Sequence, residues 1–105
     1  MNETALLYAT FASAEDAERV AETVLGERLA ACVNILAPCT SVYRWQGAIE
    51  RATEVPALFK TRPMLARRLH ERIAELHPYD LPVIERWTVE TDGPVLDWVA
   101  VETGR

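Results

Sequence analysis

The side chains best suited to chemistry lie in the segment Leu76-His77-Pro78-Tyr79-Asp80-Leu81-Pro82, where an imidazole and a phenol flank a proline. The residue before a proline is disfavoured in the helical conformation, so His77 is predicted to stand at the end of a helix. Groups fixed at such a boundary are typical of a binding or assembly surface. Two interpretations of His77 stay open here: a ligand contact, or a capping residue bonded to the last carbonyls of its helix.

Thiols and a second imidazole complete the set of metal-ligating and nucleophilic groups. Cys32 and Cys39 lie seven residues apart. On one regular strand this odd separation would turn them to opposite faces, so we interpret both as free thiols that pack as small apolar residues. His70 and His77 are two helical turns apart, about 10 Å along a helix axis, which is too far to share a metal ion. Cys39 could pair with His77 as a nucleophile, but nothing in the sequence places them together.

Signatures of enzymes and of cofactor sites do not occur in the sequence. Its glycines are scattered singly, so no glycine-rich phosphate loop is present. Cys-x-x-Cys and His-x-x-x-His pairs are also missing, which argues against a closed zinc site within one chain. No acid, base and nucleophile trio can be assembled. We therefore expect no catalytic residues, no cofactor-binding residues and no enzymatic activity.

Length and charge restrict the class of protein. With 105 residues, the chain is expected to form one domain, residues 1–105, around a single core. Its net charge of −5 argues against nonspecific binding to nucleic acid, which depends on Lys and Arg. The basic residues do gather at helical spacing with interleaved glutamates, as Arg62, Arg67, Arg68, Glu71, Arg72 and Glu75. We interpret this stretch as a solvated helix face with ion pairs rather than a phosphate-binding track.

The expected compartment is the cytoplasm. No run of the sequence approaches the roughly 18 apolar residues that a membrane span needs. The first residues, Met1-Asn2-Glu3-Thr4, lack the basic start and apolar centre of a signal peptide. Free thiols fit a reducing compartment. We expect neither a membrane partner nor secretion.

The pattern of apolar residues predicts strands and helices in alternation. The predicted strands are Thr4–Thr10, Cys32–Trp45 with an interruption at Pro38, Ala48–Arg62, and Val83–Val89. Helices are predicted after an N-cap at Ser13, from Pro63 to His77, and from Val95 to Val101. This order is βαββαβ plus a terminal helix. It predicts an α+β domain with a four-stranded antiparallel sheet and helices on one face.

The middle strands indicate assembly with further copies of the chain. Each is about fifteen residues long, against the usual five or six, so the hairpin they form must extend past the core. One sheet face has no helix of its own, and the sequence offers more large aromatic surface than a small monomer readily hides, in Tyr43, Trp45, Trp87 and Trp98. We expect a homo-oligomer. The alternative is that these rings crowd into the monomer's own core.

An ordered series of short motifs runs through nearly the whole chain. It consists of Leu29-Ala30-Ala31-Cys32-Val33-Asn34, Ser41-Val42-Tyr43-Arg44-Trp45-Gln46-Gly47-Ala48-Ile49-Glu50, Glu54-Val55, Phe59-Lys60-Thr61, and His77-Pro78-Tyr79 with Pro82. The series resembles the CutA family, the divalent-cation tolerance proteins of CutA1 type. This resemblance implies a ferredoxin-like subunit in a tight homotrimer whose long hairpins pair between neighbours. It also implies a role in the response to metal ions, with copper(II) or another divalent cation as ligand.

The resemblance also guides the choice of site residues. Copper binding in bacterial members is tied to a Cys, a His and a Glu, but the matching positions here are Ala9, Leu76 and Val83, which offer no such donor. The metal ligands therefore stay unknown, with His77 as a candidate. The motif residues expected to line a cleft between subunits are Tyr43, Trp45, Lys60, His77 and Tyr79.

A competing hypothesis comes from the architecture. CutA proteins resemble the trimeric PII signalling proteins, so the chain could instead be a signalling or scaffold module. In that case Lys60 and His77 would sense a small anionic metabolite. For Lys60 the alternative is a strand-end charge without a ligand.

Overall fold

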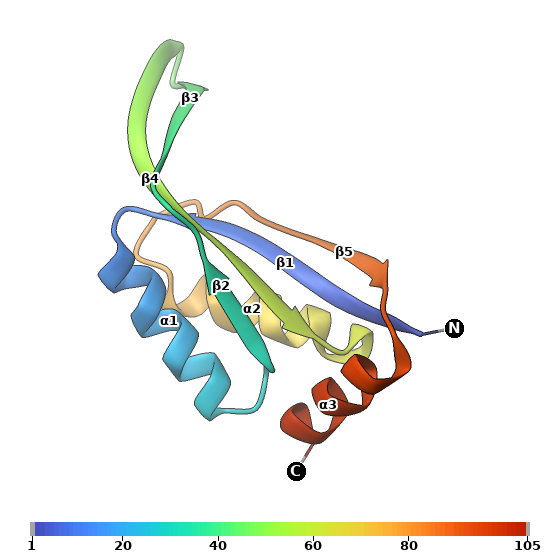
Figure 1. Ribbon diagram of the computed structural model, residues 1–105. Coiled ribbons are helices and arrows are strands. Elements are labelled where there is room, and N and C mark those ends of the chain that lie inside the picture. Colours follow the sequence, from blue (N-terminus) through green and yellow to red (C-terminus); the bar gives the residue numbers. More distant parts are fainter. Residues whose placement is uncertain (1, 105) are drawn as a thin grey trace.

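The computed structural model describes residues 2–104 and shows an α+β arrangement of one antiparallel sheet and three α-helices (Figure 1). The elements follow in the order β1 (Glu3–Phe11), α1 (Ala14–Gly26), β2 (Cys32–Ile35), β3 (Cys39–Trp45), β4 (Ala48–Thr61), the 3₁₀ turn η1 (Pro63–Leu65), α2 (Ala66–Leu76), β5 (Ile84–Glu90) and α3 (Gly93–Thr103). The predicted βαββαβ order with a terminal helix is confirmed. One detail differs, because the first strand of the predicted hairpin is divided into β2 and β3.

A β-bulge causes this division. The sheet order is β2-β4-β1-β5, and β3 continues along the same edge of β4 that β2 occupies. Ile35 pairs with Ala57 and Cys39 with Glu54, so residues 36–38 on one strand face only residues 55–56 on the other. The bulge lies where each strand carries a proline, because a proline cannot donate a ladder hydrogen bond.

The bulge corrects one sequence argument. Cys32 lies opposite Lys60 and Cys39 lies opposite Glu54, so both cysteines project from the same face of β4. The prediction of opposite faces was wrong because it assumed one regular strand. Both thiols are free, as expected, and both are half-buried. Their partners are six positions apart on β4, about 20 Å along an extended strand, so the two thiols cannot meet.

Helices α1 and α2 cover one face of the sheet and enclose the core. Ser13 begins α1 as predicted, since its hydroxyl accepts the N–H of Asp16 at 3.1 Å. The core consists of apolar side chains from both helices and from the odd-numbered positions of β1 and β4, among them Leu7, Phe11, Val20, Val24, Phe59, Leu69 and Ile73. On the outer surface Arg72 binds Glu27 with two hydrogen bonds of 2.8 and 2.9 Å and Glu75 at 3.0 Å. The predicted ion pairs of this helix face are therefore present.

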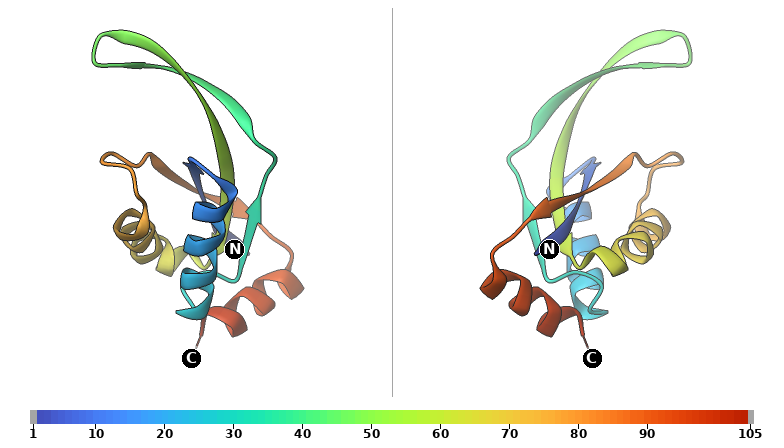
Figure 2. Two further views of the ribbon diagram at one scale, coloured as in Figure 1. Left: turned by 90° about the vertical axis from the view of Figure 1, so that its left-hand side faces the viewer. Right: turned by 90° about the vertical axis from the view of Figure 1, so that its right-hand side faces the viewer.

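The other face of the sheet is largely uncovered, and we call it the open face. Even-numbered residues of β1 and β4 point there, as do Cys32 and Trp87 through their pairing with Lys60 and Leu6. Residues 39–54 form an arm, defined as β3 with the first half of β4, that projects beyond the body of the domain (Figure 2). Large apolar side chains on this arm are exposed, for example Ile49 at 70% and Val42 at 55%. The alternative, in which Tyr43, Trp45, Trp87 and Trp98 crowd into the monomer's own core, was wrong, because all four side chains are exposed.

Two arginines hold the last helix, α3, against the sheet. The guanidinium of Arg62 donates to the hydroxyl and the carbonyl of Thr103 at 2.9 and 3.1 Å. Arg28 donates to the carbonyls of Val101 and Glu102 at 3.2 and 3.1 Å. These carbonyls have no partner within the helix, so the arginines satisfy groups that a helix end leaves unbonded. The observed helix begins two residues earlier than predicted, with Pro94 in its first turn.

Phe59 provides a direct test of the core. Its ring is fully buried and lies 6.4 Å from that of Phe11. Replacing it in Phe59→Ala should lower the free energy of unfolding by about 3–5 kcal/mol, because apolar contacts are lost and a cavity is left. Urea denaturation measures this change. Met64→Ala, at a side chain 77% exposed, is the matched control and should change the free energy by less than about 0.5 kcal/mol.

Candidate functional site

The candidate site forms where α2 ends, beside the C-terminal end of β1 and the base of the arm. Leu76 is the last helical residue, and His77 takes an extended conformation with φ −73° and ψ 134°. Its N–H still donates to the carbonyl of Ile73 at 2.9 Å. The predicted helix boundary is confirmed, and it turns the imidazole inward, where only 6% of the residue is exposed.

The imidazole of His77 uses both ring nitrogens. Nδ1 accepts the backbone N–H of Tyr79 at 3.2 Å, so this nitrogen carries no proton. Nε2 then carries the proton and donates to the carbonyl of Thr10 at 2.8 Å. The ring also stacks on Phe11 with centroids 4.5 Å apart and planes 14° apart. The ring therefore bonds to strand β1. The capping interpretation is confirmed for the backbone, because His77 is the C-cap residue and its N–H bonds to the carbonyl of Ile73.

This geometry bears on His77 as a metal ligand. A metal binds an imidazole through an unprotonated ring nitrogen, and the lone pair of Nδ1 already accepts a hydrogen bond. The ring could ligate a metal only in one of two ways. Nδ1 would have to give up its hydrogen bond to Tyr79, or Nε2 would have to lose the proton that it donates to the carbonyl of Thr10. Among residues 2–104, no group of three or more His, Cys, Asp or Glu side chains is placed to hold a metal ion.

Tyr79 links His77 to a carboxylate on the arm. Its ring lies 4.5 Å from that of His77, and its hydroxyl donates to Oε2 of Glu54 at 2.8 Å. Burial and the bond to Glu54 raise the pKa of Tyr79 well above the ordinary value of 10.0. The phenol is therefore the donor in this hydrogen bond at any physiological pH.

Glu54 is the charged group at the centre of the site. Partial burial acts to raise its pKa, but the hydroxyl groups of Ser41, Tyr79 and Thr10 and the nearby His77 favour the charged form and together hold the pKa below the ordinary 4.5. The carboxylate is thus ionised at neutral pH. It is half-buried, at the junction between the arm and the body of the domain.

Further polar groups surround this carboxylate on the open face. Cys39 lies directly opposite Glu54 across the β3–β4 pair, and Glu85 lies opposite Tyr8 across the β1–β5 pair. Burial raises the pKa of the Tyr8 phenol, and electrostatic interactions with Cys39, Glu54 and Glu85 raise it further. These four residues therefore lie close enough to interact electrostatically.

The structure brings together some of the residues predicted to line a site and separates others. His77 and Tyr79 are in contact, and Tyr43 is near enough to raise the pKa of Tyr79. Trp45 lies farther along the arm, opposite Ala48, and is 45% exposed. Lys60 is half-buried on β4, opposite Leu6. Six residues from Glu54, it is about 20 Å away along the strand.

Sequence reasoning missed the roles of Glu54, Tyr8, Thr10 and Phe11. Glu54 belongs to one of the short motifs, but its residue type and its neighbours do not distinguish it from other surface glutamates. The bond between Thr10 and His77 joins residues 67 positions apart, and no local pattern encodes such a contact. This contact could be predicted only if the pairing of the strands and the packing of α2 on the sheet were already known.

The ring of His70, the second imidazole, is also hydrogen-bonded within the chain. Arg86 of β5 donates to Nδ1 of His70 at 2.7 Å. Burial and the nearby Arg86 lower the pKa of His70 below 6.5, so this ring is neutral at neutral pH. The bond connects α2 to the edge strand and lies apart from Glu54.

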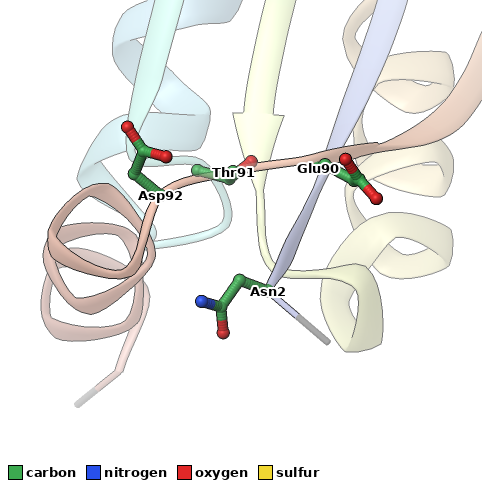
Figure 3. A pocket seen from close by; sticks show the side chains of 4 residues that line it. All are labelled: Asn2, Glu90, Thr91 and Asp92. Atoms are coloured by element: carbon green, nitrogen blue, oxygen red, sulfur yellow. The ribbon is translucent and has the colours of Figure 1, made fainter.

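Two shallow cavities lie elsewhere on the surface and do not form sites of this kind. One, of about 380 Å³, is lined by Asn2, Glu90, Thr91 and Asp92, and its two carboxylates point away from each other (Figure 3). The other, of about 410 Å³, contains the ion pairs of Arg72. Within residues 2–104, no helix has both the length and the apolar character needed to cross a membrane.

The arrangement of strand ends, arm and His-Pro-Tyr turn can be compared with known proteins. A family model described as CutA1 divalent ion tolerance protein matches residues 5–102 of the chain. The chain belongs to the CutA1 family. The resemblance that the motifs indicated is thereby confirmed.

Individual family members agree over nearly the whole length. The divalent-cation tolerance protein CutA of Pyrococcus horikoshii is 46% identical over 99 residues, covering 93% of this chain and 96% of that protein. The crystal structure of CutA1 from Ehrlichia chaffeensis has a TM-score of 0.94 at 34% identity and covers 100% of this chain and 99% of its own. CutA from Archaeoglobus fulgidus, described as periplasmic, has a TM-score of 0.90 at 36% identity over 95% of this chain and 98% of its own. These CutA1 relatives are named for tolerance of divalent cations rather than for a reaction.

The bond between Tyr79 and Glu54 makes a testable prediction about acid stability. Because the pKa of Glu54 is lowered by folding, its contribution to stability is present above 4.5 and is lost as the pH falls through the folded-state pKa. Tyr79→Phe removes one donor, so the variant should be less stable at neutral pH by about 1 kcal/mol, allowing for the solvent around Glu54. The deficit should shrink in acid.

Urea unfolding at neutral and acid pH measures this dependence. Tyr43→Phe is the control, since it deletes an exposed phenol that has no hydrogen-bond partner among residues 2–104, and its effect should be small at both pH values. A deficit in Tyr79→Phe that stays constant with pH would show that the carboxylate does not depend on this hydrogen bond.

Proposed function

We propose that the protein acts in divalent-cation tolerance as a homotrimer that binds copper(II) or another divalent cation at clefts between subunits. The residues proposed to line each cleft are Tyr43, Trp45, Lys60, His77 and Tyr79. The observation that carries the proposal is the open face of the sheet with its projecting arm. Family membership supports the tolerance role, and the arm supplies a reason for assembly.

Exposed apolar surface supports the trimer. Tyr43, Trp45 and Trp87 are each 44–45% exposed in one chain, and Ile49 is 70% exposed. β3 pairs only with β4 in the described chain, so its outer edge offers unpaired backbone groups. Such an edge and such a surface favour pairing with another chain. Packing of each arm against neighbouring subunits would cover both, and would bring Trp45 and Lys60 of different chains near Tyr79.

The copper ligands must differ from those of the bacterial relatives. Ala9 is fully buried in the core, Leu76 is half-buried, and Val83 is 62% exposed, and none carries a donor atom. The proposal therefore does not use these positions. It requires ligands from more than one subunit, because one subunit has no set of three donor side chains among residues 2–104.

The competing hypothesis of an anion-sensing module is less well supported. It needs Lys60 and His77 to act together, yet both ring nitrogens of His77 are hydrogen-bonded within the chain. The groups that act on the two phenols of the site are mostly acidic. This environment repels an anionic metabolite. A cytoplasmic location, based on the sequence and the free thiols, is part of our proposal for the protein.

Sedimentation and calorimetry test the proposal together. We expect a sedimentation mass of three chains, each of 11.8 kDa, at micromolar concentration, because isolated subunits would expose the open face. Titration with copper(II) should release or absorb heat with saturation, whereas titration with a nucleotide should not.

Each measurement can overturn one part. A folded monomer at the same concentration would remove the cleft. Heat with the nucleotide and none with copper(II) would favour the anion-sensing module instead. As a control for surface binding, Glu90→Gln, remote from the proposed cleft on the edge of the first cavity, should leave the copper titration unchanged.

A further inference from the structure

We propose that the hydrogen bond between His70 and Arg86 is an acid-sensitive latch, which holds the edge strand β5 against α2 at neutral pH and opens when His70 takes up a proton. The word latch refers to this one bond. The inference goes beyond the proposed function and does not depend on it, because the contact lies on the helix-covered face and requires neither a ligand nor a second subunit.

The latch joins two elements that flank the His-Pro-Tyr turn. Arg86 lies opposite Leu7 across the β1–β5 pair, and Leu7 belongs to the core beneath the helices, so Arg86 projects toward α2. Its Nη1 lies 2.7 Å from Nδ1 of His70, which is half-buried on α2. The two residues are 16 positions apart, so the bond closes a segment that contains the turn at residues 77–79.

The chemistry of the two groups fixes where the proton is. A guanidinium is always charged in proteins and can only donate hydrogen bonds, so Nδ1 of His70 is the acceptor and carries no proton. An imidazolium ion has a proton on both ring nitrogens and offers no acceptor. The latch therefore cannot exist together with the charged form of His70. Protonation converts the hydrogen bond into a close contact between two cations.

The charged groups that act on His70 are mostly basic. Arg86 approaches it from β5, and Glu71 and Arg67 act on it from α2 itself. Glu71 is the one acidic group of the three, and it is shared with Arg67, whose Nε lies 3.9 Å from its carboxylate. A proton on His70 therefore meets two positive charges and one partly compensated negative charge, which favours separation from Arg86.

Among residues 2–104, the other elements packed against α2 add no charged group to this set. On β1, the middle positions 5–9 present alanine and leucine on that side, and Glu3 lies about 13 Å farther along the strand than Leu7. The groups of α1 that reach α2 are bound elsewhere, Glu27 to an arginine and Arg19 to a backbone carbonyl. The turn η1 has no titratable side chain. The response to acid is thus assigned to His70 and its basic neighbours.

Strand β5 has few other contacts that hold it in place. It stands at the edge of the sheet and pairs only with β1 in the described chain. None of its residues, Ile84–Glu90, is fully buried. Elements with little buried surface open at a low free energy, and a hydrogen bond with a charged donor is stronger than a neutral one. Loss of the latch therefore removes a substantial part of what holds this strand to the body.

The latch also connects acidity to the open face. Side chains alternate along β5, so Arg86 on the helix-covered side is flanked by Glu85 and Trp87 on the open face. Opening of the latch frees the strand that carries both side chains. Protonation on one side of the sheet thereby changes the mobility of groups on the other side.

The pH interval follows from the direction in which folding moves His70. Burial and the positive charge of Arg86 lower the pKa of His70 below 6.5. The folded protein therefore binds fewer protons than the unfolded chain just below pH 6.5. The contribution of the latch to stability is fully present above pH 6.5 and is lost as the pH falls from there through the folded-state pKa. Mild acid is the condition that opens it.

Hydrogen exchange of the full-length protein in its native assembly tests the latch. The measured quantity is the protection factor, the ratio of intrinsic to observed exchange rate, which removes the direct effect of pH on the exchange chemistry. Between about pH 7.5 and about pH 5, protection of peptides from Ile84–Glu90 should fall by about 3- to 10-fold, because one partly exposed charged hydrogen bond is lost. Protection of residues 55–61 of β4 should stay within about 2-fold.

Two variants assign the response to the pair. In His70→Asn the amide oxygen can take the place of Nδ1 as acceptor from Arg86 but does not titrate, so β5 should be well protected at both pH values. Arg86→Met keeps an extended side chain without donors, so β5 should be poorly protected at both. Arg68→Met is the matched control, since Arg68 is exposed on α2 and does not act on His70, and it should respond as the wild type does.

Each result supports or overturns the latch. Equal protection of β5 at the two pH values in the wild type would overturn it. A response that persists in His70→Asn would assign the sensor to another group, such as His77, and would overturn it as well. A loss shared by residues 55–61 would mean that the whole domain opens rather than the edge strand. Full protection in Arg86→Met at neutral pH would show that the bond does not hold β5.

Discussion

The buried imidazole of His77 is the contact on which the functional end of the domain depends. It joins the end of β1, the end of α2 and the turn that follows, through one hydrogen bond from each ring nitrogen and a stack on Phe11. A buried polar ring is costly unless its donors and acceptors are satisfied, and here both are. The ring therefore fixes these three segments relative to one another. Through the hydrogen bond from Tyr79, it also fixes the position of Glu54 on the arm.

The two faces of the sheet have different roles. The helix-covered face is complete within one chain, since Phe11, Phe59, Leu69 and Ile73 are fully buried there. The open face carries aromatic and acidic groups that one chain leaves accessible, and the arm extends it beyond the body (Figure 2). Buried apolar packing is thus concentrated on the helix-covered side, and the open side is the one on which we propose that partners and ligands bind. A substitution on the first side should act on folding, whereas under the proposed function one on the second should act mainly on partners and ligands.

Local signals in the sequence predicted most of the fold. The hydroxyl of Ser13, the proline at 63 and the proline after His77 each set a helix end, and all three act through their immediate neighbours. Two features could not be predicted in this way. The contact of His77 with Thr10 spans 67 residues, and the common face of Cys32 and Cys39 depends on how β2 and β3 register against β4. Both are properties of strand pairing rather than of local composition.

The bulge at residues 36–38 determines which chemistry the arm presents. Side chains alternate along a strand, so the one extra residue exchanges inward and outward positions for everything that follows in β3. With it, Tyr43 and Trp45 share the side of Glu54, while Val42 and Arg44 take the reverse side. An evolutionary loss of a single residue here would leave the later sequence unchanged yet exchange the two faces of β3 relative to β4, so the length of this short segment is constrained more tightly than its composition.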